Sequence, residues 1–337
     1  MVFFPDPWSV ESMPDSTGGF NGFQQQHSNG RTMNNNRRIA FGYSTRCNIK
    51  CDHCVAAHDG SPETKMALET AIQIIEEMSR SQITGISFTA GEPLLYLNEM
   101  KELVRTCKMQ NIYSRIVTNG YWSKTRDRSD KMVSALKDAG LSQLRISFSR
   151  WHQKNVRREN ILNAALSCQR VGLDYFISFV TDFRKEDDVQ EQFLQDNQLK
   201  YFPEPLIYFG NATGIKQPPV FTDYPAHRCT MNPYLSPEMD MFACCDAGTQ
   251  FTKTDAFYLG SLKSHSVDHL FQKKEKNLLF HLIKTMGLTA MASFLGFKAS
   301  EIVKFRKCNL CEALFNSTDH LERLKKSATT ELLHWTR

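Results

Sequence analysis

The stretch RIAFGYSTRCNIKCDHC, residues 38–54, places a short apolar strand directly before three cysteines. Residues Ile39–Ser44 have the length and composition of a buried strand. Cys47, Cys51 and Cys54 follow it with the spacing C-x3-C-x2-C. A closed tetrahedral zinc site or a conventional four-iron cluster needs four ligands, and this loop supplies three. The loop therefore predicts a metal centre with one open coordination position.

Beyond this stretch, short apolar runs alternate with segments that carry apolar residues at helical spacing. Strands are expected at residues 39–44, 83–89, 112–118, 143–149, 175–180 and 206–209, and helices at 62–80, 97–109, 126–139, 156–171 and 185–195. Pro62 just inside the first helix and Gly140 just after the third are typical helix boundaries. This alternation predicts a parallel sheet with right-handed crossovers, either curled into an open barrel or doubly wound.

Unusual residues follow four of the expected strands, where the ligands of parallel α/β proteins bind. The cysteine loop follows the first strand, Gly91-Glu92-Pro93 the second, Asn119-Gly120 the third, and Ser149-Arg150-Trp151-His152 the fourth. All of these segments should meet at one edge of the sheet. We therefore expect an active site at the carboxyl ends of the strands.

The composition is that of an ordinary globular protein. Of the 337 residues, 41% are hydrophobic and 23% charged, which allows a sizeable core. The net charge of +5 is scattered along the chain, so no basic patch predicts a nucleic-acid partner. No apolar run approaches the roughly 18 residues needed to span a bilayer, and the first residues lack the features of a secretory signal. We expect a cytoplasmic protein with no membrane partner.

The ten cysteines are informative in such a compartment, where clustered thiols are more often metal ligands than disulfides. Cys107 and Cys168 stand apart in helical patterns and are expected to be buried as small apolar side chains. The other cysteines fall in two groups, at residues 47–54 and in the last third of the chain. Residues 1–36 are rich in Gly, Ser, Asn and Gln and predict a disordered N-terminal arm.

The first cysteine group resembles the signature of the radical S-adenosylmethionine (SAM) superfamily. The resemblance implies a [4Fe-4S] cluster held by Cys47, Cys51 and Cys54, whose open iron binds SAM. One electron from the cluster then cleaves SAM to a 5′-deoxyadenosyl radical that abstracts a substrate hydrogen. His53 stands where the family usually has an aromatic residue, and we expect it to cover the cluster without ligating it. The implied fold is α/β, a partial (β/α)6 TIM-type barrel with a small C-terminal cysteine-containing domain.

The segment after the second strand resembles the Gly-Gly-Glu-Pro motif of the same superfamily. In this chain it consists of Ala90, Gly91, Glu92 and Pro93, with Ala90 in place of the first Gly. The motif implies contact with the SAM amino group through backbone carbonyls and the acidic side chain. Ala still permits a close approach of the backbone.

Weaker resemblances extend the expected SAM pocket to later strands. Asn119 and Ser147 match positions where polar side chains face the carboxylate and ribose of SAM. Arg158, or its neighbour Arg157, could pair with that carboxylate. Asn211 stands where many relatives have an Arg after the sixth strand, which leaves its role open.

The second cysteine group resembles the auxiliary-cluster domains called SPASM and twitch. The expected ligands are Cys229, Cys244, Cys308 and Cys311, which would close a probable second [4Fe-4S] cluster; a structural zinc site with the same ligands is the alternative. Cys244 is preferred to Cys245 from the hairpin alignment, in which the usual Gly is replaced near Met239. The expected domains are 1–36 (arm), 37–215 (barrel), 216–320 (auxiliary domain) and 321–337 (tail).

These resemblances predict a radical SAM enzyme that modifies a ribosomally synthesised peptide, with flavodoxin or ferredoxin as electron donor. A radical SAM oxidoreductase acting on a small molecule such as an aminoglycoside is the first alternative. A non-catalytic zinc-binding adaptor is a minor one, because it leaves the three-cysteine loop and the Gly-Glu-Pro turn unexplained. No residue is singled out as a catalytic acid or base.

Overall fold

A computed structural model of the chain describes residues 37–56, 63–221, 229 and 231–335, without the side chains of 328–335. The expected N-terminal arm, residues 1–36, and Pro62 lie outside these ranges. The described residues belong to one compact unit, Asn36–Arg337. No helix among them is long and apolar enough to cross a membrane.

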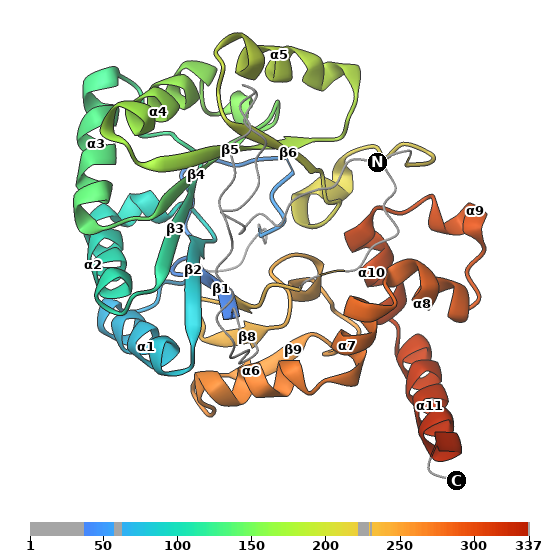
Figure 1. The fold of residues 1–337 in the computed structure, drawn as a ribbon. Helices are drawn as coiled ribbons and strands as arrows, with labels where there is room; N and C mark the ends of the chain where they lie inside the picture. The colour runs from blue at the N-terminus through green and yellow to red at the C-terminus, as the bar shows by residue number, and fades with distance from the viewer. Residues whose placement is uncertain (1–36, 57–62, 222–228, 230, 336–337) are drawn as a thin grey trace, which may run out of the picture. The chain divides into compact units, whose positions relative to one another are not determined.

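Six parallel strands form the first part of the sheet, in the order β6-β5-β4-β3-β2-β1. They are β1 (Arg37–Gly42), β2 (Ile83–Thr89), β3 (Tyr113–Thr118), β4 (Gln143–Phe148), β5 (Asp174–Thr181) and β6 (Tyr201–Pro205). The helices between them are α1 (Leu68–Arg80), α2 (Leu97–Met109), α3 (Arg126–Ala139), α4 (Arg158–Val171) and α5 (Asp188–Asp196). Figure 1 shows the helices along the outer side of the curved sheet, which makes an α/β partial barrel.

The core lies between the sheet and these helices. Ile39, Phe41, Ile86 and Phe88 alternate with more polar residues along β1 and β2 and are fully buried. Cys107 and Cys168, on α2 and α4, are also fully buried, which confirms the expectation for the two isolated cysteines. The opposite face of each strand is left for polar side chains inside the barrel.

Sequence and structure agree closely for several elements, and the largest differences concern two of them. β2, α2 and α3 have the expected bounds, and α3 ends at Gly140, whose φ is +101°. The expected first helix is shorter, because α1 begins at Leu68. The expected sixth strand at 206–209 is wrong: β6 occupies the preceding residues, Tyr201–Pro205. Its two prolines disguise it, and they are tolerated because β6 lies at the edge of the sheet.

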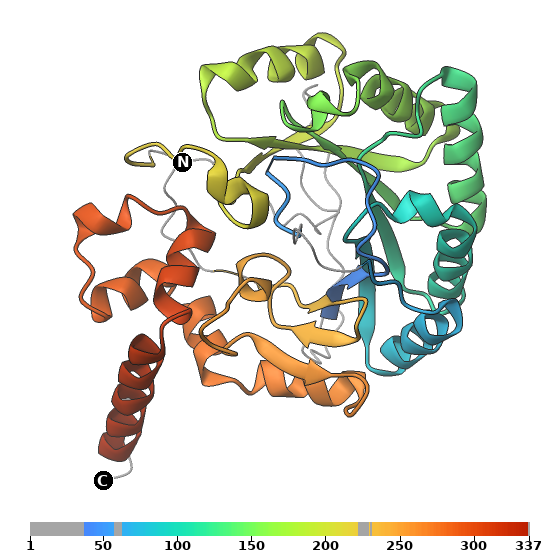
Figure 2. The ribbon, with the colours of Figure 1, turned by 180° about the vertical axis from the view of Figure 1, so that it is seen from behind.

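The sheet continues past β1 into the C-terminal part of the chain. β7 (Tyr234–Leu235) pairs in parallel with β1, and β8 (Asp240–Phe242) and β9 (Tyr258–Ser261) follow in antiparallel order. Helices then follow this extension: α6 (Val267–Glu275), α7 (Leu278–Thr285), α8 (Leu288–Phe294), α9 (Ala299–Ile302), α10 (Lys307–Phe315) and α11 (Thr318–Trp335). α11 runs through the expected domain boundary at residue 320. Figure 2 shows the same helices from behind.

Candidate active site

The cysteine loop follows β1 at the carboxyl edge of the sheet, as expected. Cys51 is 8% exposed, while Cys47 is exposed and Cys54 is half-buried. Burial raises the pKa of the Cys51 thiol to about 12, and the nearby Cys54 and Cys47 raise it further. Three thiols thus share one neighbourhood. Metal binding would replace their protons, so the donor set fits an iron–sulfur cluster with three protein ligands.

Two glycine-containing turns hold the backbone of this loop. On one side, Glu92 N donates to the carbonyl oxygen of Arg46 at 2.8 Å, and a Cβ on Gly91 would lie 2.2 Å from that same oxygen. On the other side, a Cβ on Gly210 would lie 2.5 Å from the Cys54 carbonyl oxygen. Both approaches are possible only without a side chain.

Asn211 binds the loop beside Gly210. Its backbone N donates to Cys54 O at 3.1 Å, and its side-chain Nδ2 donates to Cys51 O at 3.2 Å. The sequence left the role of Asn211 open, because an Arg is usual there. In this chain the residue secures the backbone of two of the three cysteines.

Ala90 and Gly91 both have left-handed backbone conformations, with φ of +66° and +57°. Such a conformation costs an alanine about 1–2 kcal/mol. The position of Ala90 in the turn explains why a Gly is usual there, and Ala90 keeps the conformation because the residues after it are anchored to the cysteine loop.

Glu92 is buried beneath the turn, with 2% of its surface exposed. Its carboxylate accepts hydrogen bonds from Asn119 N at 2.7 Å, Thr118 Oγ1 at 2.8 Å and Leu94 N at 3.1 Å. Burial raises the pKa of Glu92 to about 7, and the three hydrogen bonds only partly oppose this. These partners are all neutral, so a buried carboxylate here suits a cationic ligand such as an ammonium group.

Asn119 connects Glu92 to the cysteine loop. Its Nδ2 donates to Asn48 Oδ1 at 3.0 Å and lies 3.9 Å from Cys47 Sγ. The structure therefore brings together Cys47, Glu92 and Asn119, three residues that the sequence had placed after three different strands.

Ser147 and Arg158 lie differently. Ser147 is half-buried on β4, on the face opposite the fully buried Ile146 and Phe148, and therefore inside the barrel. Arg158 opens α4 with its side chain half exposed; its guanidinium packs 5.2 Å from the Phe193 ring and pairs with Glu159 at 3.5 Å. The structure does not bring Arg158 to Glu92 and Asn119.

His53 belongs to an aromatic stack that the sequence did not reveal. Its ring stacks on Trp151 at 5.2 Å and meets His152 edge-on at 4.4 Å. Burial lowers the pKa of His53 to about 4 and that of His152 well below its ordinary value. The sequence placed Arg150-Trp151-His152 at the correct edge of the sheet, but it carried no signal for these contacts.

Arg150 packs against the Trp151 ring and helps to hold it in place. Its guanidinium lies 4.3 Å from the Trp151 ring and binds Asp182 at 2.9 Å and Asp187 at 3.0 Å. Both carboxylates are buried. An ion-pair network at the ends of β4 and β5 therefore holds the stack of His53, Trp151 and His152 in place.

The tail cysteines also gather in one region. Burial raises the pKa of the Cys311 thiol, and the nearby Cys244, Cys229 and Cys308 raise it further, in that order. Cys308 and Cys311 lie on α10, and Cys244 follows β8. Four thiols from three separate segments thus share one neighbourhood.

Cys245 has different surroundings from its neighbour. Burial raises its pKa, nearby Asp246, Cys244 and Cys229 add to this, and Arg145 of β4 opposes it. Arg145 lies inside the barrel, where it donates to Ser178 Oγ at 2.9 Å and pairs with Glu204. The Cys245 side of the hairpin therefore faces the barrel interior.

The β7–β8 hairpin lacks the glycine that is usual at its turn. Met239 has φ of +72°, which is the conformation that a Gly would adopt there. Leu235 pairs with Met241 and Tyr234 with Phe242. The turn is thus strained at Met239.

Comparison with known proteins agrees with this geometry. The sequence model of the Radical SAM superfamily matches residues 42–196. A "putative peptide biosynthesis protein", YydG of Bacillus subtilis strain 168, is 25% identical over 306 residues, which cover 85% of this chain and 94% of YydG. Fe-coproporphyrin III synthase of Methanosarcina barkeri is 26% identical over 159 residues, 45% of this chain and 38% of that protein.

Among solved structures, anSMEcpe with bound AdoMet is similar in fold. It superposes with a TM-score of 0.52 at 13% identity, over 88% of this chain and 98% of that one. The barrel, the three-cysteine loop and the family match define an iron–sulfur enzyme class. The chain is a radical SAM enzyme, with its superfamily domain at residues 42–196. Enzymes of this superfamily use a [4Fe-4S] cluster and SAM.

Proposed function

We propose that this radical SAM enzyme modifies a ribosomally synthesised peptide. The observation that carries the radical chemistry is the contact between the cysteine loop and the Gly91-Glu92 turn, sealed by the 2.8 Å hydrogen bond from Glu92 N to Arg46 O. The peptide substrate is supported by YydG, which is described as a peptide biosynthesis protein and is matched over 94% of its length.

In this proposal Cys47, Cys51 and Cys54 hold the SAM-binding cluster. When bound, the cluster and SAM together supply the radical that abstracts a substrate hydrogen atom. The buried Glu92 carboxylate would receive the SAM ammonium group, since its present partners are neutral donors. The backbone of Ala90–Pro93 would form the edge of the pocket, and Asn119 would orient polar groups beside Cys47.

Ser147 and Arg158 stay in the proposed SAM pocket with different requirements. Ser147 already lies on the inner face of β4. Arg158 would have to leave the Phe193 ring, from which its guanidinium lies 5.2 Å. A long side chain at the first residue of α4 can make such a move.

Cys229, Cys244, Cys308 and Cys311 are proposed to hold a second [4Fe-4S] cluster with no open iron. The shared neighbourhood of these thiols supports four protein ligands. Cys245 is left free on the side of the barrel interior, near Arg145. We assign residues 37–215 to the barrel and 216–320 to the auxiliary domain, with 321–337 as the tail.

The same proposal sets the surroundings in which the enzyme works. Radical SAM chemistry needs a one-electron donor, for which a flavodoxin or a ferredoxin is suitable. Ten cysteines without a disulfide among the described residues fit the reducing cytoplasm.

The test is to coexpress the enzyme with short open reading frames found beside its gene and to examine each peptide by mass spectrometry. We expect one peptide to change mass or stereochemistry in a manner that requires Cys47, Cys51 and Cys54. Formation of 5′-deoxyadenosine that is stimulated by an aminoglycoside-type molecule, and by none of the peptides, would contradict the peptide assignment while leaving the radical SAM assignment intact.

A further inference from the structure

A group of metal-ligating side chains lies at the cysteine loop in an arrangement different from the three-thiol set. The Sγ of Cys51 and one ring nitrogen each of His53 and His152 lie within 4.8 Å of one another, and all three residues are buried. Around a single tetrahedral zinc ion, sulfur and nitrogen ligands are roughly 3.5 Å apart, as follows from zinc–ligand distances of about 2.0–2.3 Å. Small side-chain movements therefore suffice to close the group on one ion.

His53 carries an unsatisfied polar atom at this point. Its Nδ1 is buried and has no hydrogen-bond partner among the residues that the structure describes, and the residue is 8% exposed. A buried polar atom without a partner costs about 1–3 kcal/mol. A metal ion bound at this nitrogen would remove this cost.

His152 is already oriented as metal-bound histidines usually are. Its Nδ1 lies 2.8 Å from Ser149 Oγ, which leaves Nε2 as the ligand atom. A hydrogen bond to the second ring nitrogen typically fixes the tautomer and orientation of a ligating histidine. Trp151 fixes the orientation of the His53 ring, because it stacks on that ring and is itself held by Arg150.

We propose that Cys51, His53 and His152 form a binding site for one divalent transition-metal ion in the protein before it has received its cluster. Two imidazoles and one thiolate with an open fourth position suit Zn²⁺, Co²⁺ or Fe²⁺. Cys51 cannot serve this ion and the cluster at once. The two occupants therefore exclude each other, and the ion must leave, or be incorporated, when the cluster is assembled.

Co²⁺ titration of the cluster-free, full-length protein tests this site. The background is the Cys47→Ala/Cys54→Ala variant, which removes the competing three-thiol set but keeps Cys51. We expect it to bind about one more Co²⁺ per chain than the same variant with His152→Phe added, with the intense visible absorption of tetrahedral cobalt. His281→Phe, on the exposed side of α7, is the matched control and should keep the ion. Tail thiols contribute equally to all three proteins.

A second variant guards against loss of the fold. Ser149→Ala keeps all three ligands and removes the hydrogen bond that orients His152, so we expect the cobalt dissociation constant to rise by about tenfold or more. Equal cobalt stoichiometry with and without His152, or unchanged affinity in the folded Ser149 variant, would overturn the site. Neither measurement involves SAM, reductant or peptide, so its failure would leave the proposed function untouched.

Discussion

Gly91 lies against Arg46 so closely that a methyl group at position 91 would be 2.2 Å from the Arg46 carbonyl oxygen. We predict that Gly91→Ala lowers stability by about 2–4 kcal/mol, since it adds a backbone clash to a left-handed φ of +57°. The cysteine loop should be displaced and bind less iron. Gly214→Ala is the control, because no atom of the described residues lies within 4 Å of a Cβ there. Urea unfolding and iron analysis of both variants give the answer; similar values for the two would contradict the contact.

The triple variant Cys47→Ala/Cys51→Ala/Cys54→Ala should no longer form 5′-deoxyadenosine from SAM under reducing, anaerobic conditions. The wild-type protein should do so and show the broad iron–sulfur absorption band. The tail thiols are untouched, so the variant should still hold about four irons per chain. Stoichiometric zinc in place of iron would mean that the tail site is structural. Unchanged 5′-deoxyadenosine production would disprove the role of the loop.

The adjacent cysteines should behave differently. Beside burial, Cys244 raises the pKa of Cys311, whereas Cys245, which also lies near Cys244, is in addition close to Arg145 of the barrel. We expect Cys244→Ala to lose the second cluster and Cys245→Ala to retain it, as measured by electron paramagnetic resonance in the triple-variant background. The reverse pattern would indicate that the strained turn at Met239 shifts the hairpin by one residue on cluster binding.

Glu92 should make the stability of the cluster-free protein pH-dependent. Its pKa is about 7 in the folded protein, above its ordinary value of 4.5, because burial disfavours the charge. The folded state thus holds a proton that the unfolded state releases at lower pH. The stability from this group is present below pH 4.5 and is lost as the pH rises through 7. For a fully buried group the loss is on the order of 3 kcal/mol.

Glu92→Gln cannot titrate, so it should lack this part of the pH dependence. Urea unfolding of both proteins at pH 5 and pH 8 measures it. We expect the stability difference, wild type minus variant, to be larger at pH 5. An equal difference at the two pH values would show that Glu92 is ionised throughout the range.

Ala90→Gly should stabilise the protein modestly. Relief of the left-handed strain at φ +66° should raise the free energy of unfolding by about 1–2 kcal/mol. The greater freedom of glycine in the unfolded chain should lower it by about 0.4–1 kcal/mol. The net gain should be near 1 kcal/mol, with iron content unchanged. Thermal unfolding measures it, and a lower midpoint than the wild type would mean that the Ala90 methyl group makes a stabilising contact.

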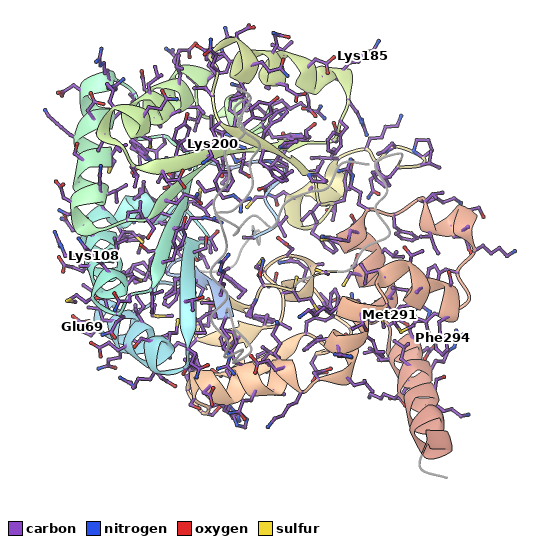
Figure 3. The ribbon with its side chains drawn as sticks, viewed as in Figure 1. Glu69, Lys108, Lys185, Lys200, Met291 and Phe294 are labelled. Atoms are coloured by element: carbon purple, nitrogen blue, oxygen red, sulfur yellow. The ribbon has the colours of Figure 1, made fainter. Side chains whose placement is uncertain are left out.

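Periodicity predicted the barrel well, because its strands and helices carry clear apolar patterns. β2 and α2 have the expected bounds, whereas β6 was missed since Pro203 and Pro205 hide an edge strand that pairs with β5 only. The side-chain view in Figure 3 labels Lys200 just before this strand and Lys108 near the end of α2. Local sequence patterns thus located most helices and strands. They failed for β6, where the edge of the sheet tolerates prolines that most strands avoid.

Spacing along the chain located the cysteine loop, Glu92 and Asn119. Each of them follows a strand of the barrel, and these strands end at one edge of the sheet. Spacing could not show that Trp151 stacks on His53, or that Asn211 secures the Cys51 and Cys54 carbonyls. Those contacts join segments far apart in sequence. The role of each of these residues depends on the folded barrel, which brings the segments together.

The nine-stranded sheet connects the segments that carry the two groups of cysteines, since β7 pairs with β1, the strand that leads into the cysteine loop. The expected domain boundary near residue 215 therefore divides the sequence but does not divide the sheet. A chain shortened there would leave β1 with an open edge, on which other chains could pair.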